Sequence, residues 1–545
     1  MINFEKIEGE FIPSGDGKCA EAKGGMVSTA FPEATEAGIR MLKRGGNAVD
    51  AACAAAFALA VCEPQASGLG GQTMALVHYR GKTFAVDGSS RAPSLAHPDV
   101  LKKEDLQIGY LAATVPSTPA VLNYLYFHYG TLRREEILEP AIQIAAEGYR
   151  TTELQSLLQK NELERFFEVP SRSGAKYFLK NGKEPYEPGE LFVQKDLAEL
   201  LKRLSRKGIK EFYQGEVARQ IDADMRKNGG LIRYDDLALI PWPIERKVIK
   251  RRYRELTVAT MPPPGAGRTL LLLLRMLEFI PSEILTEKSL KSYHLLAELM
   301  RKAYRESMER PYDPNFFPQV KRKVLLQKSF ARELAASVAE EIDSSLPITQ
   351  SADELLDHDT THLAVMDRWG NAVSLTQSIE KVYGSHAAAE GLGFLYNNYM
   401  MDFVYEDPSH PYYLRPNAVP WSSACPTIIF HRGKPWMAVG SPGSERIFST
   451  IAQFLIHIVE EGVDMGEAMR RPRLHCSLGG LISIEADRFP EDIIEGLKAK
   501  GYRIDKRSTY SYYLGCVQAV LRRHKRKGFQ GVADIRGDGT AGGPD

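Results

Sequence analysis

A threonine at the start of a predicted β-hairpin has the clearest chemical potential in this sequence. Thr360 follows the polar, acidic segment PITQSADELLDHD (347–359), whose composition is typical of an exposed connection. The runs THLAVMD and AVSLTQSI come next, around the turn RWGN, and their alternation predicts two paired strands. Pairing about that turn sets Thr360 opposite Ile379, within one residue of register. We therefore expect the hydroxyl of Ser378 and the carboxylate of Glu380 beside Thr360.

This arrangement suits a nucleophile that carries its own base. A threonine hydroxyl is weakly nucleophilic near pH 7 and needs an adjacent base. Cutting the Asp359–Thr360 bond frees an α-amino group with a pKa of about 7.7–8.0, which can accept the hydroxyl proton. The Gly-rich turn GSPGSERIF (440–448) can present backbone N–H groups to an oxyanion. The pattern predicts a self-cleaving amidase that yields fragments 1–359 and 360–545.

The elements that must position this hairpin indicate a mixed fold. Residues 24–150 alternate strand-like and helical pieces, and residues 130–235 are mostly helical. A strand-like run, RELTVATM, precedes a helical region that ends near residue 345. The last part, 391–545, predicts three helices and further strands at GFLYNN, TIIFHRGKPWMAVGS, LISIEA and CVQAVLRR. This mixture predicts an α+β or layered α/β protein, and the length of 545 residues suggests two or three domains.

Composition excludes several classes of function. With 70 basic and 69 acidic residues, the chain has no charge excess that would favour nucleic acid or a membrane surface. Its longest apolar runs, 49–61 and 269–274, are shorter than the roughly 20 residues of a membrane span, so we expect buried helices. The start MINFEKIEGEF lacks a secretory pattern, and six scattered cysteines suit a reduced, cytoplasmic protein. We expect no metal or cofactor, because no His/Cys/Asp cluster has ligand spacing and GLGG (68–71) lacks the dinucleotide pattern.

Several motifs of the sequence resemble those of one known family. The sequence resembles the γ-glutamyltranspeptidase (glutathione hydrolase) family through an ordered set of motifs that spans nearly the whole chain: residues 24–71, DTTHLAVMDRWGNAVSLTQSIEKVYGS, NNYMMDF, SSACPT, GSPGSERI and GVADIRGDGTAGG. The resemblance implies an α+β fold, a four-layer αββα sandwich of the N-terminal nucleophile hydrolase kind, in place of several domains. It also implies a precursor that cuts itself into a large subunit, 1–359, and a small subunit, 360–545, which stay together, with a dimer of such pairs as one possible assembly.

Site roles follow from that resemblance by position. Thr360 matches the catalytic threonine, and Asp359–Thr360 the cleaved bond. Ser378 takes the place of a second, assisting threonine. The remaining matches are oxyanion-hole or substrate-binding positions: Gly443 and Ser444 for the oxyanion, Glu380 and Asp402 for the substrate α-amino group, and Ser422 and Ser423 for its α-carboxylate. For Asp402, Ser422 and Ser423, turn capping is the alternative role, and for His362 near the nucleophile we expect packing.

Three departures from the family pattern concern the substrate. Ser89 occupies the position of an arginine that binds the α-carboxylate through two hydrogen bonds. Such charge-assisted pairs are among the stronger polar contacts. Arg91 lies two residues on and shares the face only in an extended strand; a structural salt bridge is the alternative. Tyr399 replaces a Gln or Glu that contacts the amine, and the stretch between Asp402 and Ser422 is shorter than in members with a lid loop.

These observations leave three hypotheses for the function. The first is a γ-glutamyl hydrolase or transpeptidase acting on glutathione and related amides through an acyl-Thr360 intermediate, with hydrolysis favoured over transfer. The second keeps the chemistry and changes the substrate to another small amide, such as oxamate, or to a glutaryl-type acyl group. The third is a binding protein that retains the fold without activity. Retention of Thr360, Ser378 and the Gly443 turn favours an enzyme.

Overall fold

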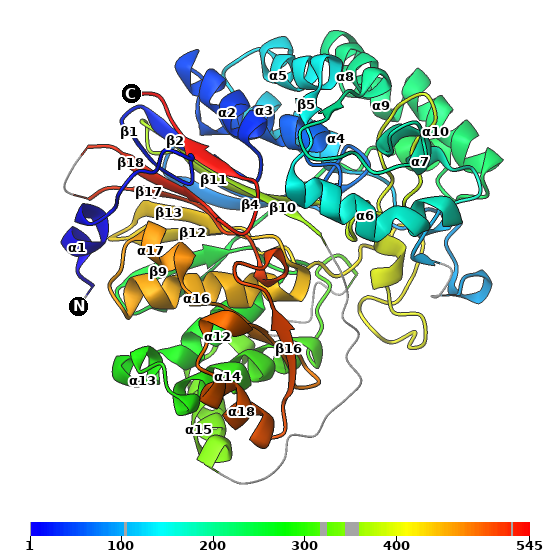
Figure 1. Cartoon of the computed structure of the whole chain (residues 1–545). Coiled ribbons are helices and arrows are strands. Elements are labelled where there is room, and N and C mark those ends of the chain that lie inside the picture. The colour runs from blue at the N-terminus through cyan, green and yellow to red at the C-terminus, as the bar shows by residue number, and fades with distance from the viewer. Residues whose placement is uncertain (1, 103–105, 317–323, 344–358, 525–526) are drawn as a thin grey trace.

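Two large antiparallel sheets form the centre of the molecule in the computed structural model, which describes residues 2–102, 106–316, 324–343, 359–524 and 527–545 (Figure 1). The first sheet has the spatial order β1 (Cys19–Ala22), β18 (Phe529–Ala533), β17 (Gln518–Arg522), β13 (Lys434–Gly440), β12 (Thr427–His431), β9 (Leu256–Thr260) and β8 (Ile249–Tyr253). The second has the order β19 (Thr540–Gly542), β2 (Gly25–Thr29), β10 (Thr361–Asp367), β11 (Ala372–Ser378), β3 (Gln72–Tyr79), β4 (Lys82–Gly88) and β7 (Ile244–Arg246). Both sheets combine strands from before and after Thr360.

Helices cover the outer face of each sheet (Figure 1). The second sheet packs against α2 (Pro32–Lys43), α3 (Ala48–Cys62) and α4 (Thr118–Tyr129). Further out, α5 (Arg134–Glu147) packs on α3, and α8 (Lys195–Lys207) packs on α5. The first sheet packs against α12 (Gly267–Leu277) and α16 (Ile447–Val459), and α14 (Leu290–Met308) and α15 (Lys328–Asp343) pack on α12. The order helix, sheet, sheet, helix is the predicted αββα sandwich.

Side-chain alternation on β10 shows how one strand serves two cores. Leu363 and Val365 belong to the core beneath α2 and α3, whereas Ala364 and Met366 belong to the core between the sheets. Successive side chains of a strand point to opposite faces, so a strand with no polar face is buried on both sides. Every residue of β10 and β11 is buried. The hairpin that begins beside Thr360 is therefore rigidly embedded.

The predicted helix over the Ala-rich run is α3, and all of its residues are buried. Asn47 caps it through a reciprocal capping box with Asp50, as expected for a polar residue at a helix start. The turn before it includes Gly45 at φ 87°, in the left-handed region that favours glycine. All six cysteines are buried and free of disulfides.

Two expectations are corrected. GFLYNN forms isolated bridges at Leu395 and Tyr396 and no strand, because the Asn397 side chain bonds the backbone of Gly70 and Thr114 in place of a continuous ladder. Asp359, expected in an exposed connection, is 1% exposed; the rest of that connection, 347–358, lies outside the described residues.

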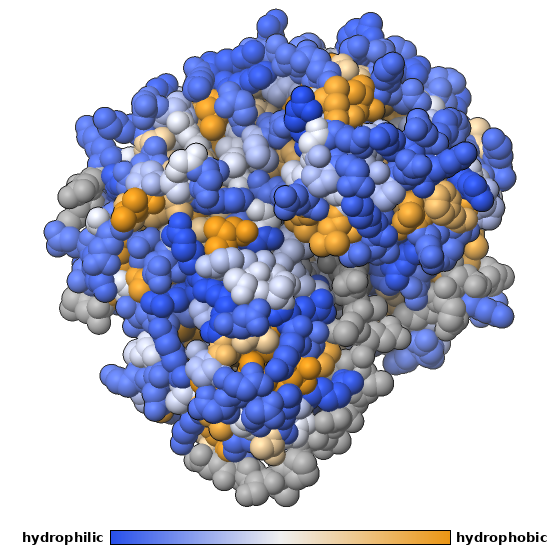
Figure 2. All heavy atoms as spheres, in the orientation of Figure 1, coloured by the Kyte–Doolittle hydropathy of each residue, from blue (hydrophilic) through white to orange (hydrophobic). Residues whose placement is uncertain are grey.

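The remaining elements surround the sandwich. They are α1 (Phe4–Gly9), α6 (Glu153–Glu168), α7 (Ser173–Phe178), α9 (Lys210–Tyr213), α10 (Glu216–Lys227), α11 (Tyr234–Ala238), α13 (Ser282–Thr286), α17 (Met465–Arg470), α18 (Glu491–Ala499), β5 (Tyr149–Arg150), β6 (Leu191–Phe192), β14 (Leu474–Cys476), β15 (Leu481–Glu485) and β16 (Arg503–Arg507). The face in Figure 2 is mostly hydrophilic with scattered apolar side chains. Among the described helices, none combines the length and apolar character needed to cross a membrane.

Candidate active site

The register of the central hairpin brings two hydroxyl groups together. Thr361 pairs with Gln377, so continuing the ladder by one residue sets Thr360 opposite Ser378, one residue from the expected pairing and within its tolerance. The Oγ atoms of Thr360 and Ser378 lie 3.2 Å apart. Thr360 is only 4% exposed. The two side chains that were predicted from the sequence to lie side by side are thus in hydrogen-bond contact.

Both hydroxyls also contact the carbonyl group of the bond expected to be cut. The Thr360 hydroxyl donates to the carbonyl oxygen of Asp359 at 2.7 Å, and the Ser378 hydroxyl reaches the same oxygen at 3.0 Å. A hydrogen bond to a carbonyl oxygen stabilises negative charge that develops there. The chain therefore holds two hydroxyl groups in contact with one peptide carbonyl.

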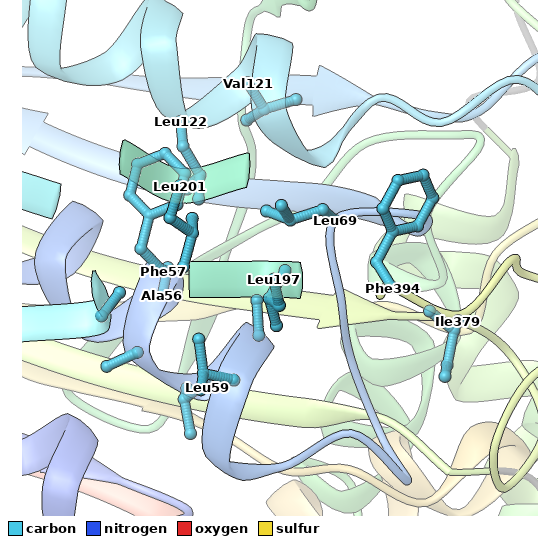
Figure 3. Close-up of a cluster of buried hydrophobic side chains, with 14 of the residues drawn as sticks. Ala56, Phe57, Leu59, Leu69, Val121, Leu122, Leu197, Leu201, Ile379 and Phe394 are labelled. Atoms are coloured by element: carbon cyan, nitrogen blue, oxygen red, sulfur yellow. The ribbon is translucent and has the colours of Figure 1, made fainter. Parts of the chain in front are cut away.

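The end of β11 is fixed by packing and by backbone hydrogen bonds. Ile379, which follows Ser378, packs into a buried apolar cluster with Leu69 and Phe394 (Figure 3). Beyond it the Glu380 N–H donates to the Ser378 hydroxyl at 2.9 Å, and the Asp359 N–H donates to the Glu380 carbonyl at 2.9 Å. Glu380 has φ 85°, a strained conformation for a residue other than glycine. Such strain persists only where the surrounding structure imposes it.

The carboxyl group of Glu63 and the phenol of Tyr512 lie near Asp359 in the buried site. The Tyr512 hydroxyl donates to Asp359 Oδ1 at 2.6 Å, and the Thr360 N–H donates to the same atom at 2.8 Å. Burial raises the pKa of Glu63 well above its ordinary value, and the charge of Asp359 adds to the shift. Glu63 therefore keeps its proton at pH values where an exposed glutamate has lost it.

The glycine-rich turn expected to hold an oxyanion follows β13. Gly443 has φ 121° and Ser444 has φ 49°, so both use the left-handed region that favours glycine. Gly443 and Asp359 line one cavity of about 370 Å³. The turn and Asp359 thus border the same cavity, while the Ser444 side chain adds backbone strain that a glycine would lack.

A second group of polar residues lies near Ser378. Tyr399, which starts a 3₁₀ turn ending at Asp402, is 2% exposed. Burial raises the pKa of its phenol well above the ordinary value, and the charge of Glu380 acts in the same direction. Hydrogen bonding with Ser378 opposes that shift. Tyr399 is thus a neutral hydrogen-bonding group beside Ser378.

Gln72, which the sequence analysis missed, connects Tyr399 to the predicted carboxylate site. The phenol of Tyr399 interacts with Gln72, whose Nε2 lies 3.5 Å from the Ser422 Oγ. Ser90 donates through its backbone N–H to Gln72 Oε1 at 2.9 Å. Ser422 also accepts from the backbone N–H of Ala424 at 3.2 Å. In the sequence, the feature that could have marked Gln72 as a site residue is its position directly after GLGG.

Two further residues predicted to bind the substrate are Asp402 and Ser423. Asp402 is an electrostatic neighbour of Lys381 and Tyr399, and Ser423 is partly exposed beside Ser422.

Arg91 is only half-buried, and its electrostatic neighbours are Asp87 and Tyr213. Among the described residues, no ion pair or hydrogen bond joins the Arg91 side chain to Ser422 or Ser423. The role of Arg91 in carboxylate binding stays a prediction.

Ser89, the residue at the family's arginine position, is turned towards a structural carboxylate. Its hydroxyl donates to Asp87 Oδ1 at 2.6 Å, and its backbone N–H donates to the same oxygen at 3.1 Å. The other oxygen of Asp87 pairs with Arg246 at 2.8 Å. Ser89 thus caps a buried ion pair.

His362 has the packing environment expected for it. Its ring contacts the hydroxyl groups of Thr376 at 2.9 Å and Ser374 at 3.3 Å. Burial lowers the pKa of His362 to about 3, so the ring is neutral near pH 7. Within the described ranges, no group of three or more His, Cys, Asp or Glu side chains is arranged to hold a metal ion.

An αββα sandwich whose central strand begins at a buried threonine defines the class of N-terminal nucleophile hydrolases. A cephalosporin acylase from Bacillus halodurans has this architecture with a TM-score of 0.87 and 28% identity, over 98% of each chain. The sequence profile described as Gamma-glutamyltranspeptidase matches residues 34–543. The chain belongs to the γ-glutamyltranspeptidase family.

Curated relatives agree on the class of enzyme and differ in substrate. The glutathione hydrolase proenzyme of Bacillus subtilis (strain 168) is 32% identical over 95% of this chain and 91% of its own length. The Acylase ACY 1 proenzyme of Pseudomonas sp. (strain V22) is also 32% identical, over 89% of this chain and 88% of its own. The protein is therefore an enzyme with γ-glutamyl transpeptidase, γ-glutamyl hydrolase or related acylase activity.

Proposed function

We propose that this enzyme matures by cutting its own Asp359–Thr360 bond and then hydrolyses γ-glutamyl amides, glutathione among them, through an acyl-Thr360 intermediate. The observation that carries the proposal is the pair of hydroxyl contacts to the Asp359 carbonyl oxygen, at 2.7 Å from Thr360 and 3.0 Å from Ser378. A nucleophile adjacent to a carbonyl that is already polarised is prepared for attack.

Maturation would begin with attack of the Thr360 Oγ on the Asp359 carbonyl carbon. The hydroxyl proton passes to the amide nitrogen, the C–N bond breaks, and an ester links Asp359 to the Thr360 Oγ. Ser378 donates to the carbonyl oxygen while it carries negative charge. Water then hydrolyses the ester, leaving the carboxylate of Asp359 and the free α-amino group of Thr360.

In the mature enzyme the same hydroxyl would act on substrate. The Thr360 amine takes the hydroxyl proton, and Oγ attacks the γ-amide carbonyl. The backbone N–H groups of Gly443 and Ser444 stabilise the oxyanion, and one such donor is typically worth about 3–4 kcal/mol. The protonated amine gives its proton to the departing nitrogen. Water, or an acceptor amine in a transfer reaction, releases the acyl group.

The binding residues support a small acyl group with polar substituents. Glu380 and Asp402 supply negative charge for an ammonium group, and Ser422 supplies a hydroxyl for a carboxylate. Because Ser89 bonds to Asp87, it does not replace the bidentate arginine of the family pattern. We expect weak binding of the γ-glutamyl α-carboxylate and a preference for hydrolysis.

A glutaryl-type acyl donor is the second candidate, and Tyr399 favours it. A neutral, buried phenol at the position of a Gln or Glu gives less support to an ammonium group. The names of two relatives, a cephalosporin acylase and Acylase ACY 1, are consistent with acyl groups other than γ-glutamyl. Comparing kcat/KM for γ-glutamyl and glutaryl anilides decides between the two candidates.

Intact-mass analysis tests the maturation step. We expect wild-type protein to give two chains, 1–359 and 360–545, that co-purify. Thr360→Ala should give one uncut, inactive chain, whereas Thr360→Ser, which keeps a hydroxyl, should still be cut. Two chains from Thr360→Ala would overturn the assignment of the nucleophile.

A further inference from the structure

The carboxyl group of Asp359 lies against the nitrogen of the bond that the proposed maturation cuts. Its Oδ1 atom accepts a hydrogen bond from the Thr360 N–H at 2.8 Å. Asp359 is buried, and a hydrogen bond is electrostatically stronger inside a protein than in water. The proposed mechanism uses the carbonyl group of Asp359 and gives its side chain no role.

The phenol of Tyr512 is a second donor to the same oxygen, at 2.6 Å. Burial raises the pKa of this phenol well above its ordinary value, and the charges of Asp359 and Glu63 act in the same direction. The phenol therefore keeps its proton and remains a donor. Two hydrogen bonds to one carboxyl oxygen favour the ionised form of that group, so Tyr512 and the scissile N–H together favour a carboxylate at this point.

The segment that carries Tyr512 is fixed to the rest of the fold. It forms one 3₁₀ turn that ends at Gly515, where φ is 88°. The Leu514 carbonyl accepts from the Thr450 hydroxyl on α16 at 2.9 Å, and the Gly515 carbonyl accepts from Arg473 at 2.9 Å. A Cβ atom at Gly515 would lie 2.5 Å from Thr450 Oγ1, so the turn packs closely on the helix. Tyr512 is thus a rigid support for its hydrogen-bond partner.

The backbone of Asp359 is held as firmly as its side chain. Its N–H donates to the Glu380 carbonyl at 2.9 Å. Its carbonyl oxygen contacts the hydroxyls of Thr360 at 2.7 Å and Ser378 at 3.0 Å. One residue therefore presents its carbonyl group to the nucleophile and its carboxylate to the nitrogen that would leave.

Glu63 adds no second negative charge beside Asp359. It follows the last turn of α3, where its carbonyl accepts from the N–H groups of Ala66 and Ser67, each at 3.1 Å. Burial, and secondarily the charge of Asp359, raises the pKa of Glu63 well above its ordinary value, so its carboxyl group stays protonated. The charge of the pair is therefore on Asp359, at the scissile nitrogen.

The departing nitrogen becomes more basic during the proposed cleavage. A bond forms between Thr360 Oγ and the carbonyl carbon of Asp359, the C–N bond breaks, and the hydroxyl proton ends on the nitrogen. The amide nitrogen is thereby converted to an amine, which can bind a further proton near neutral pH. A carboxylate already within hydrogen-bond distance stabilises the positive charge that develops there, and it does so without reorganisation.

We propose that the Asp359 carboxylate is a catalytic group of the self-cleavage step, where it stabilises the departing Thr360 nitrogen, and that Tyr512 is the positioning residue that holds it there. The inference rests on the proposed function, and it adds a requirement for a fixed carboxylate directly before the cut. The carboxylate serves one cleavage event, because the cut makes Asp359 the end of the large subunit.

The rate of self-cleavage tests the proposal on the full-length chain, with intact mass followed over time after cell-free synthesis. Asp359→Asn keeps an acceptor for both hydrogen bonds and removes the charge, so it should slow cleavage by about tenfold. Tyr512→Phe removes the supporting donor and should have an effect of similar size. Tyr126→Phe, which removes a hydroxyl on α4 that donates to Asn123 at 2.8 Å, should be cut at the wild-type rate.

A double-mutant cycle separates positioning from a general effect on the fold. If Tyr512 acts through Asp359, then Tyr512→Phe should slow the wild-type chain by about tenfold and slow the Asp359→Ala chain by less than about twofold. An equal loss in both backgrounds would show that Tyr512 acts by another route and would overturn its positioning role.

Cleavage of folded Asp359→Asn at the wild-type rate would overturn the catalytic role of the carboxylate and leave the proposed maturation standing. A wild-type chain that stays uncut would instead overturn the proposed maturation, and this proposal with it. Circular dichroism and urea denaturation establish which variants fold.

If Tyr512→Phe does not fold, Asp359→Glu decides about positioning. It keeps the charge and moves it by one methylene group away from the place that Tyr512 supports. We expect slower cleavage than in the wild type, by about tenfold. Cleavage of Asp359→Glu at the wild-type rate would show that no fixed position is needed and would reject the role of Tyr512.

Discussion

The hydroxyl oxygen of Ser378 lies 3.2 Å from that of Thr360, and both hydroxyls contact the carbonyl oxygen of Asp359. This three-way contact exists in the uncut chain. In the proposed mechanism, Ser378 acts on the peptide bond before cleavage and on the Thr360 hydroxyl after it. A residue with both roles should affect the rate of maturation and the rate of turnover separately.

Ser378→Ala should slow maturation by roughly 10- to 100-fold, because it removes one hydrogen bond to the oxygen on which negative charge develops. A time course of intact mass after synthesis measures this rate. Ser378→Thr keeps the hydroxyl and matches the usual family residue, so it should mature at a rate close to that of the wild type. Ser409→Ala, which changes an exposed serine, controls for the loss of a hydroxyl. Wild-type maturation of Ser378→Ala would contradict the role given to this side chain.

Glu63 should make the uncut precursor less stable as the pH rises. Burial, and secondarily Asp359, raises its folded-state pKa. The folded chain therefore holds a proton that the unfolded chain releases above about pH 4.3. The stabilisation is complete below the unfolded pKa and is lost as pH rises towards the folded one.

Glu63→Gln in the uncut Thr360→Ala background should therefore raise the urea midpoint relative to its parent, and by more at pH 8 than at pH 5. Glu36→Gln changes an exposed glutamate on α2, 52% exposed, and should show no such pH-dependent gain. A gain that is equal at both pH values would show that Glu63 is ionised in the folded chain.

The hairpin could be predicted because the residues that determine its strand pairing are neighbours in the sequence. Alternating β-rich runs around a Gly-Asn turn set the strand pairing, and the ladder found differs by one residue from the expected register. Tyr512 could not be predicted in the same way. It reaches Asp359 only through the strand order of the first sheet and the packing of β16, which depend on contacts between distant parts of the chain.

Tyr399→Gln should shift the enzyme towards γ-glutamyl donors. An amide at this position can accept a hydrogen bond from the substrate ammonium group, whereas the buried phenol of Tyr399 is neutral and already interacts with Ser378 and Gln72. We expect the ratio of kcat/KM for γ-glutamyl over glutaryl anilide to rise by about tenfold. Tyr405→Phe provides the matched control, because it removes a nearby tyrosine hydroxyl that bonds only to the Met400 carbonyl in the contacts described. An unchanged ratio in Tyr399→Gln would place the ammonium group elsewhere.

The pH dependence of the mature enzyme should report the amine of Thr360 and not the ring of His362. Activity requires the unprotonated amine, so kcat/KM should rise with pH through the titration of an α-amino group, about 7.7–8.0 when unperturbed. His362 lies close in the chain, but burial lowers its pKa to about 3, and its ring is held by Thr376 and Ser374. The His362 ring therefore titrates far below the pH range in which activity is measured. A pH–rate profile between pH 5 and 10 in wild type and His362→Gln measures this, with circular dichroism to confirm folding. The midpoint should be the same in both proteins, whatever the change in stability; a midpoint that moves with the loss of the imidazole would assign the base to His362.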